Sequence, residues 1–235
     1  MRDHLRSVAR PPLDVIFCHG GRSYFNDIAA EEGWLIGARS DTPLYGPCAH
    51  HRATMIDWNF TRPDWPRHID YIREQRPRYA TAPDIFDAAD LAQTEDQVAA
   101  IAEYAQHVIV VPKSSGIIDR IMTWPRAILG YSVPTVYGGT EVPLWEFADH
   151  PVHLLGGSPA QQVKLSQYLR VISVDCKMHL RAANYGKYYN DQLLNTLISE
   201  DEKQDETGLR ACFRISSRNI IQNWRRTYVV NNPRD

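Results

Sequence analysis

Residues 152–177, VHLLGGSPAQQVKLSQYLRVISVDCK, contain two short apolar runs separated by one amphipathic segment. The first run, at residues 153–155, stops at Gly156-Gly157. Ser158 and Pro159 follow, and these residue types favour the N-cap and the first position of a helix. The stretch therefore predicts a strand, a glycine turn, a helix and a second strand, which is the repeating unit of a parallel α/β fold.

The second apolar run, at residues 171–174, ends directly in Asp175. In α/β folds, the catalytic and binding side chains usually lie at the carboxyl ends of the strands. Asp175 is therefore the first candidate for a functional residue, and the question becomes what this carboxylate acts on.

The composition is that of an ordinary globular protein, with 43% hydrophobic and 23% charged residues among 235. A net charge of -2 gives no overall attraction to nucleic acid, although a local basic patch would still attract it. No apolar run is long enough to cross a membrane, and the charged N-terminus does not resemble a signal peptide. We expect a cytoplasmic protein without membrane partners.

The four cysteines, at positions 18, 48, 176 and 212, are far apart and form no C-x-x-C pair. This spacing favours reduced thiols and argues against a cysteine-based zinc site. No G-x-G-x-x-G follows a predicted strand, so a dinucleotide site has no support. We expect no metal and no cofactor.

Eight apolar runs read as strands, and most of them are followed by a helical segment. The runs are 15–18, 34–38, 53–56, 79–82, 108–111, 127–129, 153–155 and 171–174. This alternation predicts an α/β fold, a compact (β/α)8 TIM barrel over residues 13–183. An open, doubly wound sheet is the alternative. The clearest predicted helix covers residues 94–107, with Thr94 as its N-cap.

Residues 184–235 form a predicted C-terminal helical extension packed on the barrel. Within it, residues 184–206 are polar, the stretch SEDEKQDE at residues 199–206 reads as a solvated loop, and residues 208–226 read as a basic helix. One interpretation is a helix that closes the barrel through its apolar side chains Leu209, Phe213, Ile220 and Trp224. The other is a face that contacts phosphates through arginines 210, 214, 218, 225 and 226.

Polar side chains recur at the predicted carboxyl ends of the strands, which all open on one face of a barrel. They are Asp57, Asp84, Lys113, Tyr131 and Asp175. Three carboxylates that share a pocket are expected to differ in pKa. Such a division suits displacement at a sugar carbon, with one carboxylate as nucleophile and another as proton carrier. Glycines at 130, 156 and 157 leave room for a flat ligand or a phosphate.

The segments HLLGGSPAQQV and VISVDCKM resemble the end of the tRNA-guanine transglycosylase barrel. There, a Gly-x-Gly-Thr-Pro loop begins a helix and the next strand ends in a Phe-Asp-Cys that contains the nucleophile. The resemblance covers about residues 13–180, and only its last forty residues are specific. It is looser to the tRNA enzymes than to their DNA-acting relatives, the DpdA-like 7-deazaguanine transglycosylases of phages and bacteria. The zinc subdomain of the tRNA enzymes is absent from this sequence, which favours DNA over RNA.

The resemblance implies that Asp175 is the nucleophile and Asp57 the general acid/base. The family's Asp-Ser-Gly-Gly-Phe is replaced here by Asp57-Trp-Asn-Phe. By the same resemblance, the site exchanges guanine in nucleic acid for a 7-deazaguanine through a covalent aspartyl–sugar intermediate. A phage-encoded protein of this kind would act in the host cytoplasm.

The resemblance also implies which residues hold the substrate. Asp84 would bind the guanine Watson–Crick edge, Lys113 stands near the place of the family's base-reading glutamine, and the Gly130 backbone would contact O6. Tyr131 or Tyr79 would stack on the base, beside the Gly156-Gly157 loop. Lys177, His179 and Arg181 follow the nucleophile and would hold the flanking phosphates.

Two other functions remain open. Histidines 19, 50, 51 and 153 would suit a metal-dependent hydrolase, but no H-x-H follows the first strand and His50-His51 precedes a strand. The second alternative is a catalytically silent barrel of the same family that binds nucleic acid or a partner enzyme. A homo- or hetero-oligomer is compatible with either.

Overall fold

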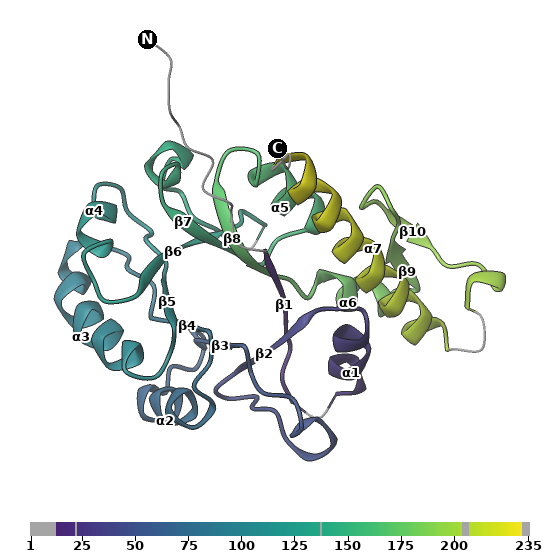
Figure 1. The fold of residues 1–235 in the computed structure, drawn as a ribbon, viewed down its shortest axis with the longest axis horizontal. Coiled ribbons are helices and arrows are strands. Elements are labelled where there is room, and N and C mark those ends of the chain that lie inside the picture. The colour runs from purple at the N-terminus through teal and green to yellow at the C-terminus, as the bar shows by residue number, and fades with distance from the viewer. Residues whose placement is uncertain (1–12, 22, 137, 204–206, 232–235) are drawn as a thin grey trace, which may run out of the picture.

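A computed structural model describes residues 13–21, 23–136, 138–203 and 207–231. Eight parallel strands form a closed barrel in chain order, and the last strand pairs with the first (Figure 1). The strands are β1 Asp14–Cys18, β2 Leu35–Arg39, β3 Met55–Asp57, β4 Tyr79–Thr81, β5 His107–Val110, β6 Ala127–Ser132, β7 Pro151–Leu155 and β8 Arg170–Asp175. The predicted (β/α)8 barrel is therefore confirmed, and the open sheet is not formed.

Helices alternate with the strands around the outside of the barrel. They are α1 Tyr24–Glu31, α2 Trp65–Gln75, α3 Leu91–Ala102, α4 Ile118–Ile121, α5 Pro159–Leu165, α6 Met178–Ala183 and α7 Gly208–Asn231. Only short 3-10 turns, η1 Gly46–Cys48 and η3 Leu144–Phe147, lie between β2 and β3 and between β6 and β7. These two reduced connections explain how the barrel fits a chain shorter than the roughly 250 residues that are typical.

The start of α5 follows the prediction. The Ser158 hydroxyl accepts a hydrogen bond from the Gln161 N–H at 3.3 Å, and the Gln161 side chain accepts from the Ser158 N–H at 3.2 Å. This reciprocal pair is a capping box, with Pro159 at the first helical position.

The predicted start of α3 is wrong. Thr94 is buried within the helix rather than at its end. A 3-10 turn, η2 Ala88–Asp90, leads into the helix, and the Asp87 carboxylate caps that turn by accepting from the Ala89 N–H at 2.7 Å. The earlier aspartate provides the cap that the threonine was expected to provide, because both residue types favour N-caps.

The hydrophobic core has two layers. Ile16, Met55, Ile109 and Ile128 fill the inside of the barrel, together with Tyr79 and Val111. A larger layer lies between the outer face of the strands and the surrounding helices. Both faces of the strands are therefore buried, which explains why the strands appear in the sequence as continuous apolar runs rather than alternating ones.

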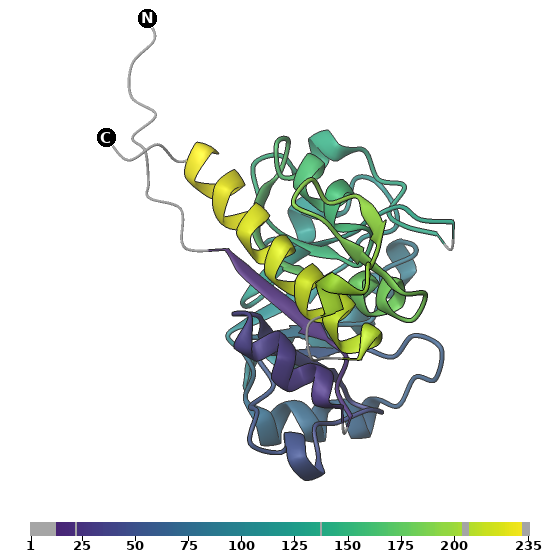
Figure 2. The ribbon, with the colours of Figure 1, turned by 90° about the vertical axis from the view of Figure 1, so that its right-hand side faces the viewer.

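The long C-terminal helix α7 packs beside α1, as Figure 2 shows. Its Phe213 and Ile220 are fully buried, and Trp34 Nε1 donates to the Ser217 carbonyl at 3.0 Å. Arg218 donates to both carboxylate oxygens of Glu32 at 2.9 and 3.0 Å. The apolar face of α7 thus closes the barrel, and at least part of its basic face is bound to α1.

The predicted helical extension at residues 184–235 is not helical throughout. A hairpin of β9 Lys187–Tyr189 and β10 Asn195–Leu197 forms there. The Tyr189 N–H donates to Ser216 Oγ at 2.9 Å, and its carbonyl accepts from Asn219 at 2.9 Å. Because α7 supplies these partners, the hairpin depends on a contact that a local reading of the polar sequence does not contain.

No helix among the described residues is long and apolar enough to cross a membrane. All four cysteines are free and buried, and none is joined in a disulfide.

Candidate active site

Two aspartates end strands at the carboxyl face of the barrel. Asp57 is the last residue of β3, and Asp175 is the last residue of β8. They are coupled through their charges, since Asp175 raises the pKa of Asp57. The structure therefore brings together the two side chains to which catalysis was assigned.

Asp175 is held from two sides by its neighbours on β7. Its Oδ1 accepts a hydrogen bond from the Gly156 N–H at 3.2 Å and lies 3.3 Å from His153 Nε2. The Gln162 amide donates to the carbonyls of Asp175 and Gly156 at 2.7 and 2.8 Å. The glycine loop and α5 thus fix the backbone that carries the carboxylate.

A buried polar column continues from Asp175 into the barrel. His153 is fully buried, and its Nδ1 lies 2.8 Å from Ser173 Oγ. Ser173 is also hydrogen-bonded to Tyr79, whose hydroxyl donates to Asp14 at the opposite end of the barrel at 2.8 Å.

A bulge in β8 brings Ser173 and Asp175 into this column. Val152 pairs with Val171, but the next residue, His153, pairs with Ser173, so that β8 contains one extra residue at Ile172. Val171 and Val174 both face the outer layer, whereas Ile172 packs inside the barrel. A bulge changes which side chains face inward, and here it brings Ser173 beside the imidazole and Asp175 to the mouth of the barrel.

Asp57 lies in an environment that disfavours its charge. Burial and repulsion by Asp175 raise its pKa to about 7, although the Thr81 hydroxyl donates to its Oδ1 at 3.2 Å. The positive charges of Lys177 and Arg39 partly oppose this rise. At neutral pH the carboxyl is therefore partly protonated, so it can both give and accept a proton.

Asp84 and Lys113 form a second charged pair, on the loops that follow β4 and β5. Lys113 Nζ lies 3.4 Å from Asp84 Oδ2 and 3.4 Å from the Gly139 carbonyl. Burial raises the pKa of Asp84, and Lys113 opposes that rise. The pair is partly exposed, so its carboxylate and ammonium are available to a polar ligand.

The surroundings of Gly130 and Tyr131 do not fit the predicted contacts of these residues with a base. A Cβ at Gly130 would lie within 2.8 Å of side-chain atoms of Val111, Ile109 and Leu155, so apolar side chains fill the space that was assigned to a ligand. Tyr131 is 5% exposed and packs edge-on against Phe147 in the outer layer. Adjacent residues of a strand face opposite sides, and Tyr131 falls on the side away from the barrel interior.

The two glycines of the β7–α5 loop have different surroundings. Both have positive φ, +60° at Gly156 and +76° at Gly157. Space is open where a Cβ of Gly156 would lie, whereas a Cβ of Gly157 would lie 2.4 Å from Val133 Cγ1. Gly156 can therefore face a ligand and donates to Asp175, while Gly157 is required for close packing.

The three residues assigned to phosphates also differ. Lys177 and Arg181 are exposed, and Lys177 is close enough to Asp57 to lower its pKa. His179 is fully buried, with its ring stacked between Trp34 and Phe213. Burial lowers its pKa to about 3. The predicted contact of His179 with a phosphate is wrong, because His179 lies on the inner face of α6 and its ring is shielded from solvent.

Three polar residues at this end were not predicted as parts of the site. They are Thr81, Arg39 and, apart from its consideration as a metal ligand, His153. Arg39 and Thr81 each end a strand, so the rule that identified the aspartates applies to them as well, whereas His153 lies in the middle of β7. The pairing of His153 with Ser173 was not readable, because it depends on the bulge in β8.

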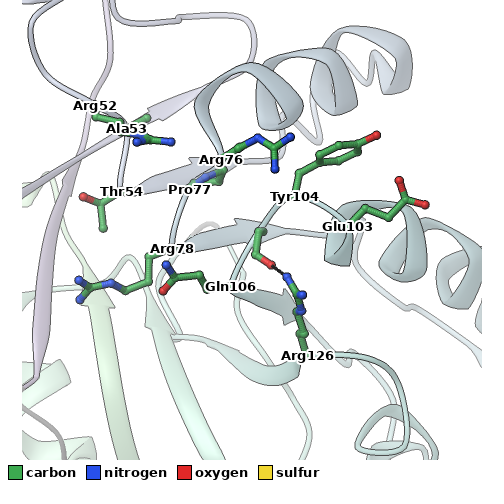
Figure 3. A pocket seen from close by; sticks show the side chains of 11 residues that line it. Arg52, Ala53, Thr54, Arg76, Pro77, Arg78, Glu103, Tyr104, Gln106 and Arg126 are labelled. Carbon is green, nitrogen blue, oxygen red and sulfur yellow. Dashed lines mark hydrogen bonds between the residues drawn. The ribbon is translucent and has the colours of Figure 1, made fainter.

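A cavity of about 550 Å³ lies at the opposite, amino end of the barrel (Figure 3). Four arginines line it, at positions 52, 76, 78 and 126, together with Glu103 and Tyr104. All four precede strands β3, β4 or β6, whereas the aspartates end strands. The cavity is therefore separate from the candidate active site.

A family model described as a family of unknown function, DUF6610, matches residues 29–225. The chain belongs to the DUF6610 family. The match runs from α1 into α7 and so includes Asp57, Asp84 and Asp175. No curated protein matches the sequence. The DUF6610 description assigns no activity, so the resemblance to guanine transglycosylases stays a prediction.

Proposed function

We propose that the chain exchanges guanine for a 7-deazaguanine in nucleic acid, with DNA as the favoured polymer. The observation that carries this proposal is the unequal pair of carboxyls at the barrel mouth. Asp175 is oriented by the Gly156 N–H, and Asp57 has a pKa raised to about 7. Displacement at a sugar carbon requires one carboxylate to attack and a second group to carry a proton.

The reaction has two displacements at the same carbon. An oxygen of Asp175 attacks C1′, the bond from C1′ to N9 breaks, and its electron pair leaves with the guanine. Asp57 supplies the proton that neutralises the departing base. The incoming 7-deazaguanine then gives its N9 proton to Asp57, its N9 attacks C1′, and the ester electrons return to Asp175. Two inversions give net retention at the sugar.

Base recognition in this proposal relies on Asp84 and Lys113. Their polar groups lie 3.4 Å apart and are partly exposed. A carboxylate accepts from the N1–H and amino group of guanine, and an ammonium donates to its O6 or N7. Neither Tyr131 nor Gly130 contributes, since both are enclosed by apolar side chains.

The polymer itself would be held by exposed cations beside the nucleophile. Lys177 is the N-cap of α6 and Arg181 lies in its last turn, so both follow Asp175 closely in the chain. Contacts of this kind with phosphate position a strand without reading its sequence. A base in duplex DNA must be flipped out of the stack to reach a carboxylate at the barrel mouth.

The experiment is an exchange assay with the full chain. Guanine-containing duplex DNA, single-stranded DNA and RNA are each incubated with labelled guanine, and label in the polymer is measured. The wild type should incorporate label, Asp175→Asn should not, and Asp119→Asn, at an exposed site on α4, should match the wild type. A polymer–protein adduct that resists denaturation and requires Asp175 would identify the intermediate.

A catalytically silent, nucleic-acid-binding barrel is the second candidate function. The arginine-lined cavity at the amino end favours it, because this cavity lies away from every aspartate of the proposed site. Nucleic-acid binding without label incorporation, equal in the wild type and in Asp175→Asn, would support this function and overturn the exchange reaction.

A further inference from the structure

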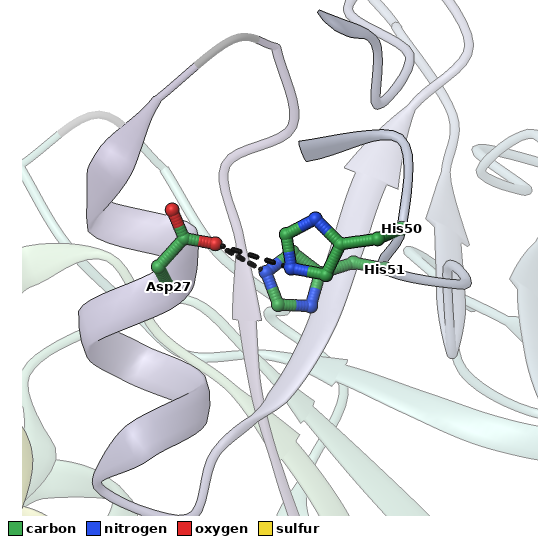
Figure 4. Close-up of side chains that lie close together, drawn as sticks. All are labelled: Asp27, His50 and His51. Atoms are coloured by element: carbon green, nitrogen blue, oxygen red, sulfur yellow. Dashed lines mark hydrogen bonds and ion pairs between the residues drawn. The ribbon is translucent and has the colours of Figure 1, made fainter. Parts of the chain in front are cut away.

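One group of three metal-binding side chains stands out among the described residues, on the side of the barrel (Figure 4). Asp27 projects from α1, and His50 and His51 project from the segment that joins η1 to β3. One potential ligand atom from each side chain lies within 4.8 Å of the other two. We call these three residues the His–His–Asp cluster.

Both imidazoles approach the same carboxylate oxygen. His51 Nε2 lies 2.7 Å from Asp27 Oδ1, and His50 Nε2 lies 3.5 Å from it. Ligands of a tetrahedral zinc ion, with bonds of roughly 2.0–2.2 Å, stand about 3.4 Å from one another. The His50 distance fits this separation, and the His51 distance requires an outward movement of several tenths of an ångström.

The hydrogen bonding of His50 prepares its Nε2 to bind a cation. Its Nδ1 lies 2.6 Å from the Pro47 carbonyl oxygen, which can only accept, so Nδ1 carries the proton. With the proton on Nδ1, Nε2 is the ring nitrogen that offers a lone pair, and it faces the Asp27 carboxylate at 3.5 Å. Two acceptors that face each other repel, and a metal ion between them removes the repulsion. Metal-binding histidines are commonly oriented by such a bond to a backbone carbonyl.

The cluster joins two segments of the chain, α1 and the connection from β2 to β3. The connection from β2 to β3 has no α-helix, and Cys48 Sγ contacts the Ser23 carbonyl at 3.1 Å near the start of α1. A metal held by Asp27 and the two histidines would fasten the same connection to α1 about one helical turn beyond that contact. The His50 side chain is 62% exposed, so an ion can enter from solvent.

We propose that the His–His–Asp cluster binds one divalent transition-metal ion of the zinc class and that this ion tethers the β2–β3 connection to α1. Two imidazoles and one carboxylate suit such an ion and leave a position for water. The site lies apart from Asp57 and Asp175, and the proposal does not depend on the exchange reaction.

The test is a zinc titration of the metal-free full chain in competition with a chromophoric chelator. The wild type should bind one equivalent, and His50→Ala and Asp27→Ala should each weaken that binding at least about tenfold, since even residues that only orient a ligand cost 10–100-fold. His150→Ala is the matched control and should bind as the wild type does. Its histidine lies outside the cluster, just before β7.

Thermal unfolding gives the second measurement. Zinc should raise the melting temperature of the wild type and of His150→Ala, because an ion that binds the folded state stabilises it. It should not do so for the two cluster variants, whose metal-free melting temperatures establish that they fold. Absence of zinc binding by the wild type, or equal affinity in the wild type and both cluster variants, would overturn the proposal.

Discussion

The charged side chains at the two ends of the barrel differ in how well their charges are compensated by neighbouring groups. At the amino end, Arg78 pairs with Asp14, while Arg52 and Arg126 donate to the carbonyls of Gln75 and Ala105. At the carboxyl end, Asp57 accepts from Thr81 and still has a pKa raised to about 7 by burial and by Asp175.

The difference separates stabilising charges from reactive ones. A guanidinium that is satisfied by a carboxylate or a carbonyl stays in one ionisation state, and its effect is on stability. A carboxyl whose charge is poorly compensated can change its ionisation state near neutral pH. Groups of the second kind cluster at functional sites. The carboxyl end is therefore the better place for chemistry, although a large cavity lies at the amino end.

The largest expected effect is on the exchange rate. Asp57→Asn should lower the rate by about 10²–10⁴-fold, the usual contribution of a general acid or base. Because the acid form is needed to protonate the leaving guanine, the wild-type rate should fall as pH rises through about 7. Steady-state rates over a pH series measure both effects.

Glu103→Gln, at the other end of the same barrel, is the control for this comparison. It should keep the rate within a few-fold of the wild type once the folded fraction is equal. An equal loss in both variants would mean that the two ends do not differ in the way described.

The second effect is on stability. Folding raises the pKa of Asp57 from 3.8 to about 7, so the folded state binds this proton more tightly than the unfolded state does. The contribution of this proton to the free energy of unfolding is therefore fully present below pH 3.8 and is lost as pH rises from 3.8 to about 7. At about 1.4 kcal/mol for each tenfold change in proton affinity, the loss is at most roughly 4 kcal/mol.

Asp57→Asn cannot ionise and should lose this dependence. Urea unfolding at about pH 5 and about pH 8 compares the two proteins within the transition and above it. The variant should gain stability relative to the wild type at the higher pH. A constant difference at both pH values would contradict the raised pKa.

The third effect separates the two glycines beside Asp175. Gly156→Ala meets open space and should cost about 1 kcal/mol for the left-handed backbone alone. Gly157→Ala bears the same cost and also brings a Cβ to 2.4 Å from Val133, which should add about 1–3 kcal/mol. Unfolding in urea measures both variants. Equal losses would show that Val133 moves aside.

The smallest effect belongs to the amino end. Arg76 is the C-cap of α2 and has φ +46°, a conformation that glycine adopts without strain. Its guanidinium lies 5.6 Å from the centroid of the Tyr104 ring. Arg76→Gly should relieve up to about 1 kcal/mol of strain and lose about 0.5 kcal/mol of cation–π contact. The melting temperature should change little, and the exchange rate not at all. A lower exchange rate would link the two ends.

The sequence predicted the parts of this molecule that depend on local pattern. All eight strands and the Ser158 capping box follow from apolar runs and residue types that act within a few positions. Asp57 and Asp175 reach the same face because every parallel strand of a barrel ends there.

The predictions that were wrong concern the direction of a side chain or a partner far along the chain. Whether Tyr131 faces inward depends on which alternate residues of β6 face the barrel interior. In β8, the bulge changes which residues face inward. The burial of His179 depends on Trp34 and Phe213, which are brought to it by the closed barrel and by α7. Neither dependence leaves a mark in the residues nearby.

The extra residue in β8 has a consequence for how this fold tolerates change in length. Strand side chains alternate in direction, so the orientation of Asp175 is a matter of parity, counted from the outer-facing Val171. Removing Ile172 would restore a regular ladder and change no residue of the site. It would leave Ser173 and Asp175 facing inward and Val174 facing the helices, so the barrel mouth should tolerate the loss of this residue, whereas a deletion in a strand without a bulge reverses every side chain on one side of it.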